Sequence, residues 1–371
     1  MALEFLYPLS KLNPELFGVL NVIYYITFRA AMAAITAMVI GVLAGPYMID
    51  WLVRMKIGQT IRGEGVKDLY ERHKGKAGTP TMGGTLILAS ITVSMFLWGN
   101  WHNELVWTCL LVTWALGALG FLDDYTKLKE KKYKGVHAKQ KLIVQISIGL
   151  AVGVMLYCFH PLGDNRPYDL PMPFLKNVFI PLGMFYIPFV ALVITGASNA
   201  VNLTDGLDGL ASGCIIVASL AFAALCYIVG RFDYSAYLGI LFVKESGELA
   251  VFAMALVGAT MAFLWYNAHP AKVFMGDTGS LALGGALGTL AVLIKQELVL
   301  VIIGGVFVME AMSVILQVTS YRYRGGKRIF LMAPLHHHFE MKGWSETTIV
   351  VRFWILAAIF AFMGLATLKI R

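Results

Sequence analysis

Two acidic motifs at the ends of apolar segments carry the residue types that bind metal ions. Asp123 and Asp124 are adjacent where a long apolar run stops, and Asp277 follows Phe274-Met-Gly just ahead of another run. Carboxylate oxygens are the hard ligands that Mg2+ binds in proteins, and free amides at a helix N-terminus favour phosphate. This pattern predicts a magnesium ion and a phosphorylated substrate at one site. Any one of these aspartates could instead cap a helix or pair with a lysine.

A third motif, residues 199–209, combines polar side chains with glycines. Its sequence is Asn-Ala-Val-Asn-Leu-Thr-Asp-Gly-Leu-Asp-Gly. Glycines let the backbone approach a ligand closely, and the amide and carboxylate groups could bind a sugar or a base. If the motif opens a helix, Asp205 and Asp208 share one face because they are three residues apart. The candidate ligand-binding side chains here are Asn199, Asn202, Asp205 and Asp208.

Other polar residues near the apolar runs are weaker candidates. Lys76 and Thr81 could contact a phosphate or a base, although a loop lysine and ordinary turn chemistry explain them equally well. Phe274 could stack on a flat base. Glu310 and Gln317 belong to one polar stripe along a later apolar helix. We assign Gln317 to the site, whereas the role of Glu310 stays open.

Three adjacent histidines, His336, His337 and His338, lie in a polar segment well inside the chain. Zinc is one reading, but adjacent histidines do not have the spacing of a familiar tetrahedral site, and no cysteine is near. We expect at least one imidazole to hydrogen-bond a phosphate or a sugar.

The composition predicts an integral membrane protein that is all-α and polytopic. The chain is 58% hydrophobic and 14% charged, with a mean hydropathy of +0.71, against about 45–50% apolar and 25% charged in soluble domains. Helices must dominate because backbone amides find no water in the bilayer. We predict one transmembrane domain over residues 1–371, with ten spans near residues 20–48, 81–99, 105–122, 142–159, 179–197, 211–229, 249–266, 280–294, 299–320 and 347–368.

The basic residues gather in alternate connections between these spans. The connections after the first, third and ninth spans are rich in Lys and Arg, and the others are sparse. Because Lys and Arg favour the cytoplasmic side, we expect the rich loops to face the cytoplasm and both termini to face the periplasm. The acidic motifs then lie at the cytoplasmic face. The net charge of +8 is thereby explained without nucleic acid as a partner.

Together the motifs resemble those of the polyprenyl-phosphate N-acetylhexosamine-1-phosphate transferases, and within them the phospho-N-acetylmuramoyl-pentapeptide transferase branch. The resemblance covers nearly the whole chain. The acidic motifs recur across the superfamily, whereas the triple histidine points to the muramoyl branch. The matching segments are Gly78-Thr-Pro-Thr-Met-Gly-Gly, Phe121-Leu-Asp-Asp-Tyr, Asn202-Leu-Thr-Asp-Gly-Leu-Asp-Gly, Phe274-Met-Gly-Asp and Pro334-Leu-His-His-His.

The resemblance implies a reaction at the cytoplasmic face of the bacterial inner membrane. Phospho-MurNAc-pentapeptide would pass from UDP-MurNAc-pentapeptide to undecaprenyl phosphate, giving lipid I and UMP, with Mg2+ required. The resemblance also implies a homodimer and a groove for membrane lipid beside a bent ninth helix. Gly304 and Gly305 could permit that bend.

The resemblance further implies roles for individual residues. The catalytic residues would be Asp123, Asp124, Asp277 and His336, and the three aspartates would also hold the metal ion. The substrate-binding positions would be Lys76, Thr81, Lys127, Lys139, Asn199, Asn202, Asp205, Gly206, Leu207, Asp208, Asn267, Phe274, Gly276, Ser280, Gln317, His337 and His338.

Alternatives remain at this stage for both mechanism and class. The lipid phosphate could attack directly, or an aspartate could act first as nucleophile and form a covalent phospho-sugar intermediate. A sister enzyme that moves GlcNAc-1-phosphate would share most of the motifs. A secondary transporter could also have ten spans, but transporter sites usually lie near the midplane of the bilayer. A purely structural scaffold would not explain five aspartates gathered at one face.

Overall fold

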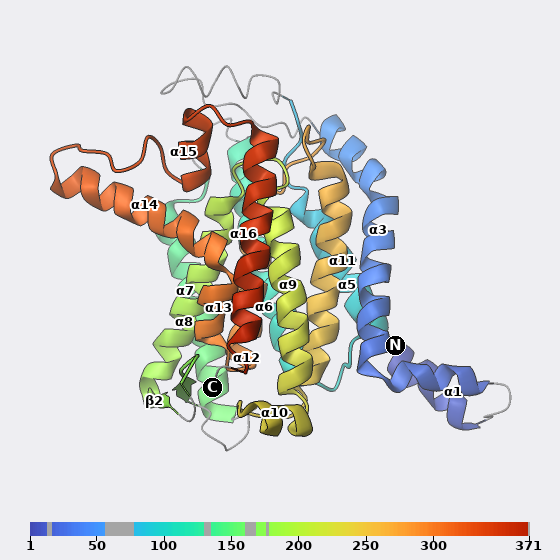
Figure 1. The fold of residues 1–371 in the computed structure, drawn as a ribbon. Coiled ribbons are helices and arrows are strands. Elements are labelled where there is room, and N and C mark those ends of the chain that lie inside the picture. Colours follow the sequence, from blue (N-terminus) through green and yellow to red (C-terminus); the bar gives the residue numbers. More distant parts are fainter. Residues whose placement is uncertain (13–16, 56–77, 130–134, 160–167, 176–177, 370–371) are drawn as a thin grey trace.

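The computed structural model describes residues 1–12, 17–55, 78–129, 135–159, 168–175 and 178–369, and it is mostly helical (Figure 1). The short helices outside the main bundle are η1 (Ala2–Leu6), α1 (Tyr7–Leu12), η2 (Gly18–Tyr24), η4 (Gly183–Phe185), α10 (Phe232–Leu238), η5 (Ser246–Glu248) and α15 (Leu335–Met341). The bundle consists of α3 (Ile26–Arg54), α5 (Gly84–Trp98), α6 (Glu104–Lys129), α7 (Ala138–Phe159), α8 (Tyr186–Thr204), α9 (Leu210–Val229), α11 (Leu249–Asn267), α12 (Gly276–Leu293), α13 (Glu297–Ile303), α14 (Gly305–Tyr323) and α16 (Glu346–Ala366).

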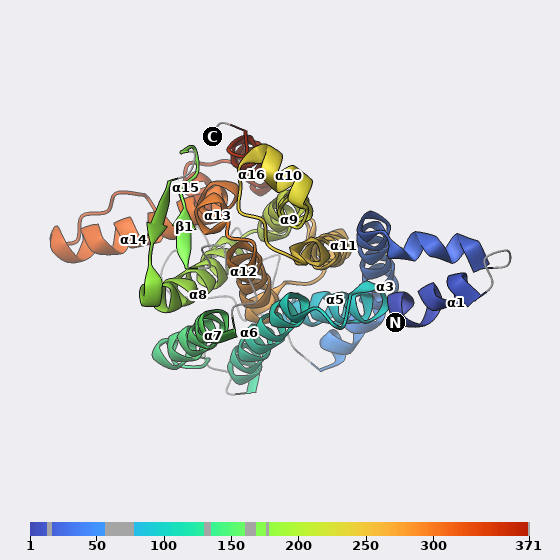
Figure 2. The same cartoon turned by 90° about the horizontal axis from the view of Figure 1, so that it is seen from below.

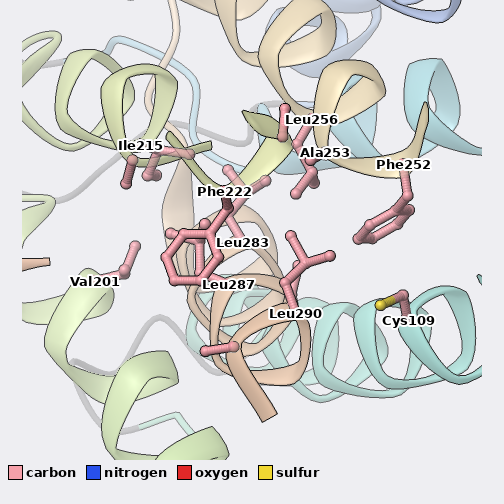
Figure 3. Close-up of a cluster of buried hydrophobic side chains, with 14 of the residues drawn as sticks. Cys109, Val201, Ile215, Phe222, Phe252, Ala253, Leu256, Leu283, Leu287 and Leu290 are labelled. Carbon is pink, nitrogen blue, oxygen red and sulfur yellow. The ribbon is translucent and has the colours of Figure 1, made fainter. Parts of the chain in front are cut away.

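Helix α12 forms the centre of the bundle. Every residue from Thr278 to Leu293 is buried, and the view along the bundle shows α12 surrounded by other helices (Figure 2). Leu283, Leu287 and Leu290 of α12 pack in one apolar cluster with side chains of neighbouring helices, among them Phe222 (Figure 3). Because α12 is covered on all sides, its first turn has a fixed position relative to the helices around it.

The described residues contain seven helices that are long and apolar enough to cross a membrane, or eight if α13 and α14 form one bent span. Nine of the ten segments predicted as spans each overlap one helix of the bundle, whereas the segment near residues 299–320 overlaps two. The segment near residues 179–197 begins on a strand before it enters α8, and α5 is a shorter apolar helix of 15 residues. The described part of the chain is mostly helical, as the all-α expectation has it, and it also contains one small sheet. Strands β1 (Asp169–Pro171) and β2 (Phe179–Pro181) form a small antiparallel hairpin in which Leu170 is opposite Ile180.

The segment predicted as the ninth span is not a single straight helix. It breaks at Gly304 into α13 and α14, which meet at an angle of 85°. The break lies at the glycine pair that the sequence offered for a bend. A Cβ atom at Gly305 would lie 2.6 Å from the ring of Phe360 on α16, so glycine is required there for the close approach. Beyond the break, α14 leaves the bundle sideways (Figure 1).

The end of the bundle opposite α15, called the far end here, is held by a buried ion pair. The guanidinium of Arg29 on α3 forms two hydrogen bonds of 2.6 Å to the carboxylate of Glu248, just before α11. Arg29 also donates to the carbonyl of Trp98 at the end of α5. One side chain therefore ties α3, α5 and α11 together. Both marked chain termini lie toward this same end (Figure 1).

Replacing Glu248 by alanine should destabilise the protein strongly, because the buried guanidinium of Arg29 would lose its partner. We expect a loss of about 3–5 kcal/mol in the free energy of unfolding, measured by denaturant unfolding in detergent micelles. The double replacement Arg29→Met with Glu248→Met should recover most of this loss. The control is Asp233→Ala, which breaks an exposed pair with Arg231 and should cause no measurable change. Equal stability of the Glu248→Ala variant and the wild type would show that this pair is not a structural tie.

Candidate active site

Three carboxylates meet at the end of the bundle that carries α15. Asp123 and Asp124 lie near the end of α6, and Asp277 lies in the first turn of α12. One oxygen from each carboxylate lies within 4.8 Å of the others. Asp123 and Asp124 are buried and Asp277 is partly buried. We call these three side chains the acidic cluster.

Asp124 holds the start of α12 against the end of α6. Its carboxylate accepts hydrogen bonds from the backbone amides of Asp277, at 3.2 Å, and Thr278, at 3.0 Å. The hydroxyl of Thr278 donates to the same carboxylate at 2.8 Å. Unpaired amides at the start of a helix attract negative charge. Asp124 of α6 therefore caps the N-terminus of α12. From the sequence alone, Asp277 could also have filled this role.

Two lysines compensate the charge of the acidic cluster. The ammonium of Lys127 lies 2.6 Å from Asp123 and 3.1 Å from Asp277. Lys141, near the start of α7, donates to Asp277 and lies 3.7 Å from Asp123. Lys139, the other lysine assigned to the site from the sequence, is exposed. The sequence does not single out Lys141 for the site, because spacing along the chain does not show which lysine turns inward.

Helix α8 contributes amides beside the acidic cluster. Asn202 donates to Asp277 and to the hydroxyl of Ser280, both at 2.8 Å. Asn199, one turn earlier, donates to the side chain of Gln145 on α7 at 2.9 Å. The structure therefore brings Asn202 and Ser280 to the cluster, whereas Asn199 joins α7 to α8 beside it.

Close helix contacts make the acidic cluster possible. A Cβ atom at Gly120 of α6 would lie 2.2 Å from the backbone carbonyl oxygen of Asp277. A Cβ atom at Gly84 of α5 would lie 2.1 Å from the backbone nitrogen of Gly279 on α12. Backbones this close leave no room for a side chain, so α5, α6 and α12 converge only because glycine occupies these positions.

The loop that precedes α12 is part of the same assembly. Phe274 is held by its backbone, which donates to Pro80 at 2.8 Å and accepts from Gly83 at 2.9 Å. Gly276 has a φ of 73°. A Cβ atom there would lie 2.6 Å from Asp124 and 2.9 Å from the hydroxyl of Thr81. Thr81, Phe274 and Gly276 therefore border the cluster. Lys76 lies outside the described residues.

The motif of residues 199–209 does not open a helix, because its first six residues are the end of α8. Residues 205–209 form the turn between α8 and α9, so Asp205 and Asp208 do not share a helix face. Burial, together with the nearby carboxylates of Asp277, Asp124 and Asp208, raises the pKa of Asp205 to about 7. Asp205 can thus take up or release a proton near neutral pH. Leu207 is buried in the apolar core.

His336 lies against this turn and against a buried glutamate. The residue lies on α15, and its ring is completely buried. Its Nδ1 lies 3.2 Å from the carboxylate of Glu310 on α14. A Cβ atom at Gly206 would lie 2.1 Å from Nε2 of His336, so the histidine touches the turn of residues 205–209. Glu310, whose role the sequence left open, is the acidic neighbour of the most buried of the three histidines.

The other two histidines face different partners. The ring of His337 lies 2.6 Å from the carboxylate of Glu340 on the same short helix. His338 accepts a hydrogen bond from the backbone amide of Leu331 at 3.1 Å. His336 is the histidine whose ring is shown against Gly206 in the turn next to the acidic cluster, and successive residues of a helix point in different directions.

Asp208 belongs to a second group of possible metal ligands. Its carboxylate lies 3.1 Å from the ring of His269, which in turn lies 3.4 Å from Glu346 at the start of α16. Glu346 also accepts from the backbone amide of Asp208 at 2.8 Å. These contacts connect α16 to the turn of residues 205–209. The sequence gave no sign of His269 or Glu346, since neither lies in a motif that suggested chemistry.

Two predicted binding residues have amides that are occupied within the protein. Asn267 accepts from Gly209 and Ser212 and donates to the carbonyl of Val273 at 2.9 Å. Gln317 accepts from the backbone amides of Ile329 and Phe330, and it donates to the carbonyl of Phe330 at 3.0 Å. The structure therefore shows Asn267 bracing the loops of the site.

Gln317 is not among the residues that contact the acidic cluster. It lines a cavity of about 390 Å³ between α14 and the chain that returns from it. The other lining residues are Val314, Val318, Tyr321, Arg322, Arg328, Leu331, Met332, Ala333 and Met341.

Comparison with known proteins shows which family the chain resembles. Residues 106–295 match the model of glycosyl transferase family 4, and residues 76–88 match the phospho-N-acetylmuramoyl-pentapeptide-transferase signature 1. The phospho-N-acetylmuramoyl-pentapeptide-transferase of Methylacidiphilum infernorum is 53% identical over 95% of this chain and 97% of its own length. The protein of the same name from Desulfotalea psychrophila is 52% identical over the whole of both chains.

The chain is thus a multi-pass membrane enzyme that belongs to glycosyl transferase family 4. Within this family it is a member of the phospho-N-acetylmuramoyl-pentapeptide-transferases. This assignment agrees with the resemblance that the motifs showed.

Replacing Gly120 by alanine should lower activity, because a Cβ atom would push the first turn of α12 away from α6. A displacement near 1 Å at a reacting centre can cost about 100-fold, and we expect kcat to fall about 10- to 100-fold. Gly196→Ala is the matched control, since no atom lies within 4 Å of a Cβ atom there, and its kcat should stay near the wild-type value. Equal kcat values for the two variants would show that the contact between α6 and α12 does not position the site.

Proposed function

We propose that this enzyme transfers phospho-MurNAc-pentapeptide from UDP-MurNAc-pentapeptide to undecaprenyl phosphate, forming lipid I and UMP in a Mg2+-dependent reaction. The family assignment supports the muramoyl substrate. The observation that carries the chemistry is the acidic cluster, where three carboxylates from α6 and α12 lie within 4.8 Å of one another.

The residues of the acidic cluster fit a magnesium ion. Asp123, Asp124 and Asp277 offer several hard oxygen atoms at one place, which is the ligand type that Mg2+ binds. Mg2+ bound there would neutralise the charge of the diphosphate and of the phosphate that attacks it. Asp277 is our first choice of ligand because its carboxylate is the least buried of the three.

The remaining groups relieve repulsion between two phosphorylated substrates. The ammonium groups of Lys127 and Lys141 already lie at the acidic cluster and can attract phosphate oxygens that approach it. Asn202 orients Asp277 by a hydrogen bond of 2.8 Å. We propose that the turn of residues 205–209, Phe274 and His336 border the nucleotide and sugar.

We propose direct attack by the lipid phosphate. A phosphate monoester has a second pKa of about 6, so at neutral pH the acceptor is mostly a dianion and needs little help from a general base. The oxygen of the acceptor forms a bond to the β-phosphorus of the sugar nucleotide, and UMP leaves with the electrons of the broken bond. The contacts of two carboxylates support this proposal. Asp124 accepts hydrogen bonds from backbone amides, and Asp277 is in contact with an asparagine and with lysines.

The proposed placement in the membrane follows the charge pattern. We propose one transmembrane domain with ten spans. Besides the seven long apolar helices, the spans are α5, α12 and the bent pair of α13 and α14, which is counted as a single span. Both termini would face the periplasm, and the acidic cluster would face the cytoplasm, where UDP-sugars are found. The two marked termini at the far end support this (Figure 1). We also propose that the enzyme acts as a homodimer, on the basis of the resemblance.

The purified protein should release UMP from UDP-MurNAc-pentapeptide only when undecaprenyl phosphate and Mg2+ are both present. Asp277→Ala should abolish this release because it removes the favoured metal ligand. Asp50→Ala, at an exposed position of α3, is the control and should retain activity. Near-normal Mg2+-dependent activity of Asp277→Ala would disprove the ligand role. Preference for UDP-GlcNAc in the same assay would instead identify a GlcNAc-1-phosphate transferase.

Direct attack predicts that no sugar phosphate becomes attached to the protein. Incubation with Mg2+ and UDP-MurNAc-pentapeptide labelled in the sugar phosphate, without lipid, should leave the protein unlabelled after denaturation. Labelled protein and a matching burst of UMP would establish the two-step route through an aspartate. The Asp123→Ala and Asp124→Ala variants would then show which carboxylate carries the label.

A further inference from the structure

The end of α14 forms a cationic projection that the reaction described above does not use. We call residues 321–331 the α14 tip. The tip holds Arg322, Arg324, Lys327 and Arg328, so that four of seven consecutive residues are basic. Residues 317–334 include no Asp or Glu. All four basic side chains are exposed, and none of them forms an ion pair within the described part of the chain.

The α14 tip is a folded element with its own hydrogen bonds. The hydroxyl of Ser320 donates to the carbonyl of Lys327 at 2.9 Å, and the amide of Gly326 donates to the carbonyl of Tyr321 at 3.0 Å. Gly325 and Gly326 have positive φ values, which this turn requires. Gln317 holds the returning chain through Ile329 and Phe330. The four cations are therefore presented together by a defined turn.

The helix that carries the tip has the surface of a segment in contact with lipid. After the break at Gly304, α14 leaves the bundle and rises toward the end that carries α15 (Figure 1). Met312, Ile315, Leu316 and Val318 on this helix are each at least 44% exposed. An exposed apolar stem that ends in basic residues is typical of a helix with its stem in hydrocarbon and its charges among headgroups.

We propose that the α14 tip binds the headgroups of anionic phospholipids in the leaflet on the side of the acidic cluster. Charge complementarity favours this partner, because clustered Lys and Arg beside a membrane segment attract anionic lipid. Tyr321 and Tyr323 are 55% and 85% exposed and suit the boundary between water and hydrocarbon, where tyrosine is enriched. The inference rests on the proposed orientation of the enzyme and not on its transferase chemistry.

Lipid binding at the tip would bear on the site through the chain that follows. Leu331 donates its backbone amide to His338, and three residues later Pro334 leads into α15 with His336. A headgroup bound to the tip would therefore also restrain the segment that leads from the tip into α15.

A fluorescent label at the tip tests which molecules surround it. Cys158 is the exposed cysteine and the other three are buried, so Cys158→Ser with Tyr323→Cys allows bimane to be attached at residue 323 of the full chain. The labelled enzyme is placed in nanodiscs that contain either brominated phosphatidylglycerol or brominated phosphatidylcholine at the same mole fraction. Because headgroup attraction enriches the anionic lipid, it should quench the label roughly twofold or more above the zwitterionic lipid.

Charge variants decide whether the four cations cause this enrichment. The combined replacement of Arg322, Arg324, Lys327 and Arg328 by Gln should remove the difference between the two lipids. The matched control removes four exposed lysines elsewhere, and should keep the difference; these are Lys11, Lys129, Lys244 and Lys369.

Three outcomes would overturn the proposal. The first is equal quenching by both lipids, or an excess that persists in the variant without tip charges. The second is the absence of quenching by either lipid, which would place the label in water or against a protein surface such as a second copy of this chain. The third is loss of the excess when one equivalent of undecaprenyl phosphate is added, because the tip would then bind the acceptor. A transferase assay that fails would leave the quenching result unaffected.

Discussion

Negative charge at the edge of hydrocarbon must be compensated, and the acidic cluster shows how this chain does so. The compensating groups come from several elements: Lys127 on α6, Lys141 on α7, and the backbone amides of Asp277 and Thr278 on α12. A carboxylate near lipid costs a few kcal/mol or more unless it is paired or hydrated. Separating any of these elements would leave charge uncompensated. The same contacts therefore balance the charge of the site and hold the central helices together.

The sequence predicted those features of the structure that have a local cause. The position of each helix follows from the length of an apolar run, because backbone amides in hydrocarbon must bond within the helix. The family resemblance implied a bend in the ninth span, and the adjacent glycines Gly304 and Gly305 were named as residues that could permit it. The approach of Asp277 to Asp123 and Asp124 follows from the alternation of spans, which returns these motifs to one end of the bundle. The chemical roles of these residues, in contrast, stay predictions.

Features that depend on contacts between distant segments were not predictable in this way. Lys141 contacts the acidic cluster and Lys139 does not point to it, because of the way in which α7 is oriented relative to α12. The internal hydrogen bonds of Asn267 and Gln317 depend on loops whose path no motif indicated. The association of Asp208 with His269 and Glu346 joins parts of the chain that are 61 and 138 residues apart. The resemblance named candidate positions, whereas the partner that each amide or carboxylate faces is seen only in the structure.

Helix α11 is fastened at both of its ends to neighbouring segments of the protein, and this fixes the distance between those segments. Glu248 joins its beginning to Arg29, and Asn267 at its last residue holds Gly209 and Val273. Its 19 residues span about 28 Å, close to the hydrocarbon thickness of about 30 Å. The helix cannot slide along its axis without breaking one of these attachments. It therefore keeps a constant separation between the buried ion pair at the far end and the turn of residues 205–209 beside the acidic cluster.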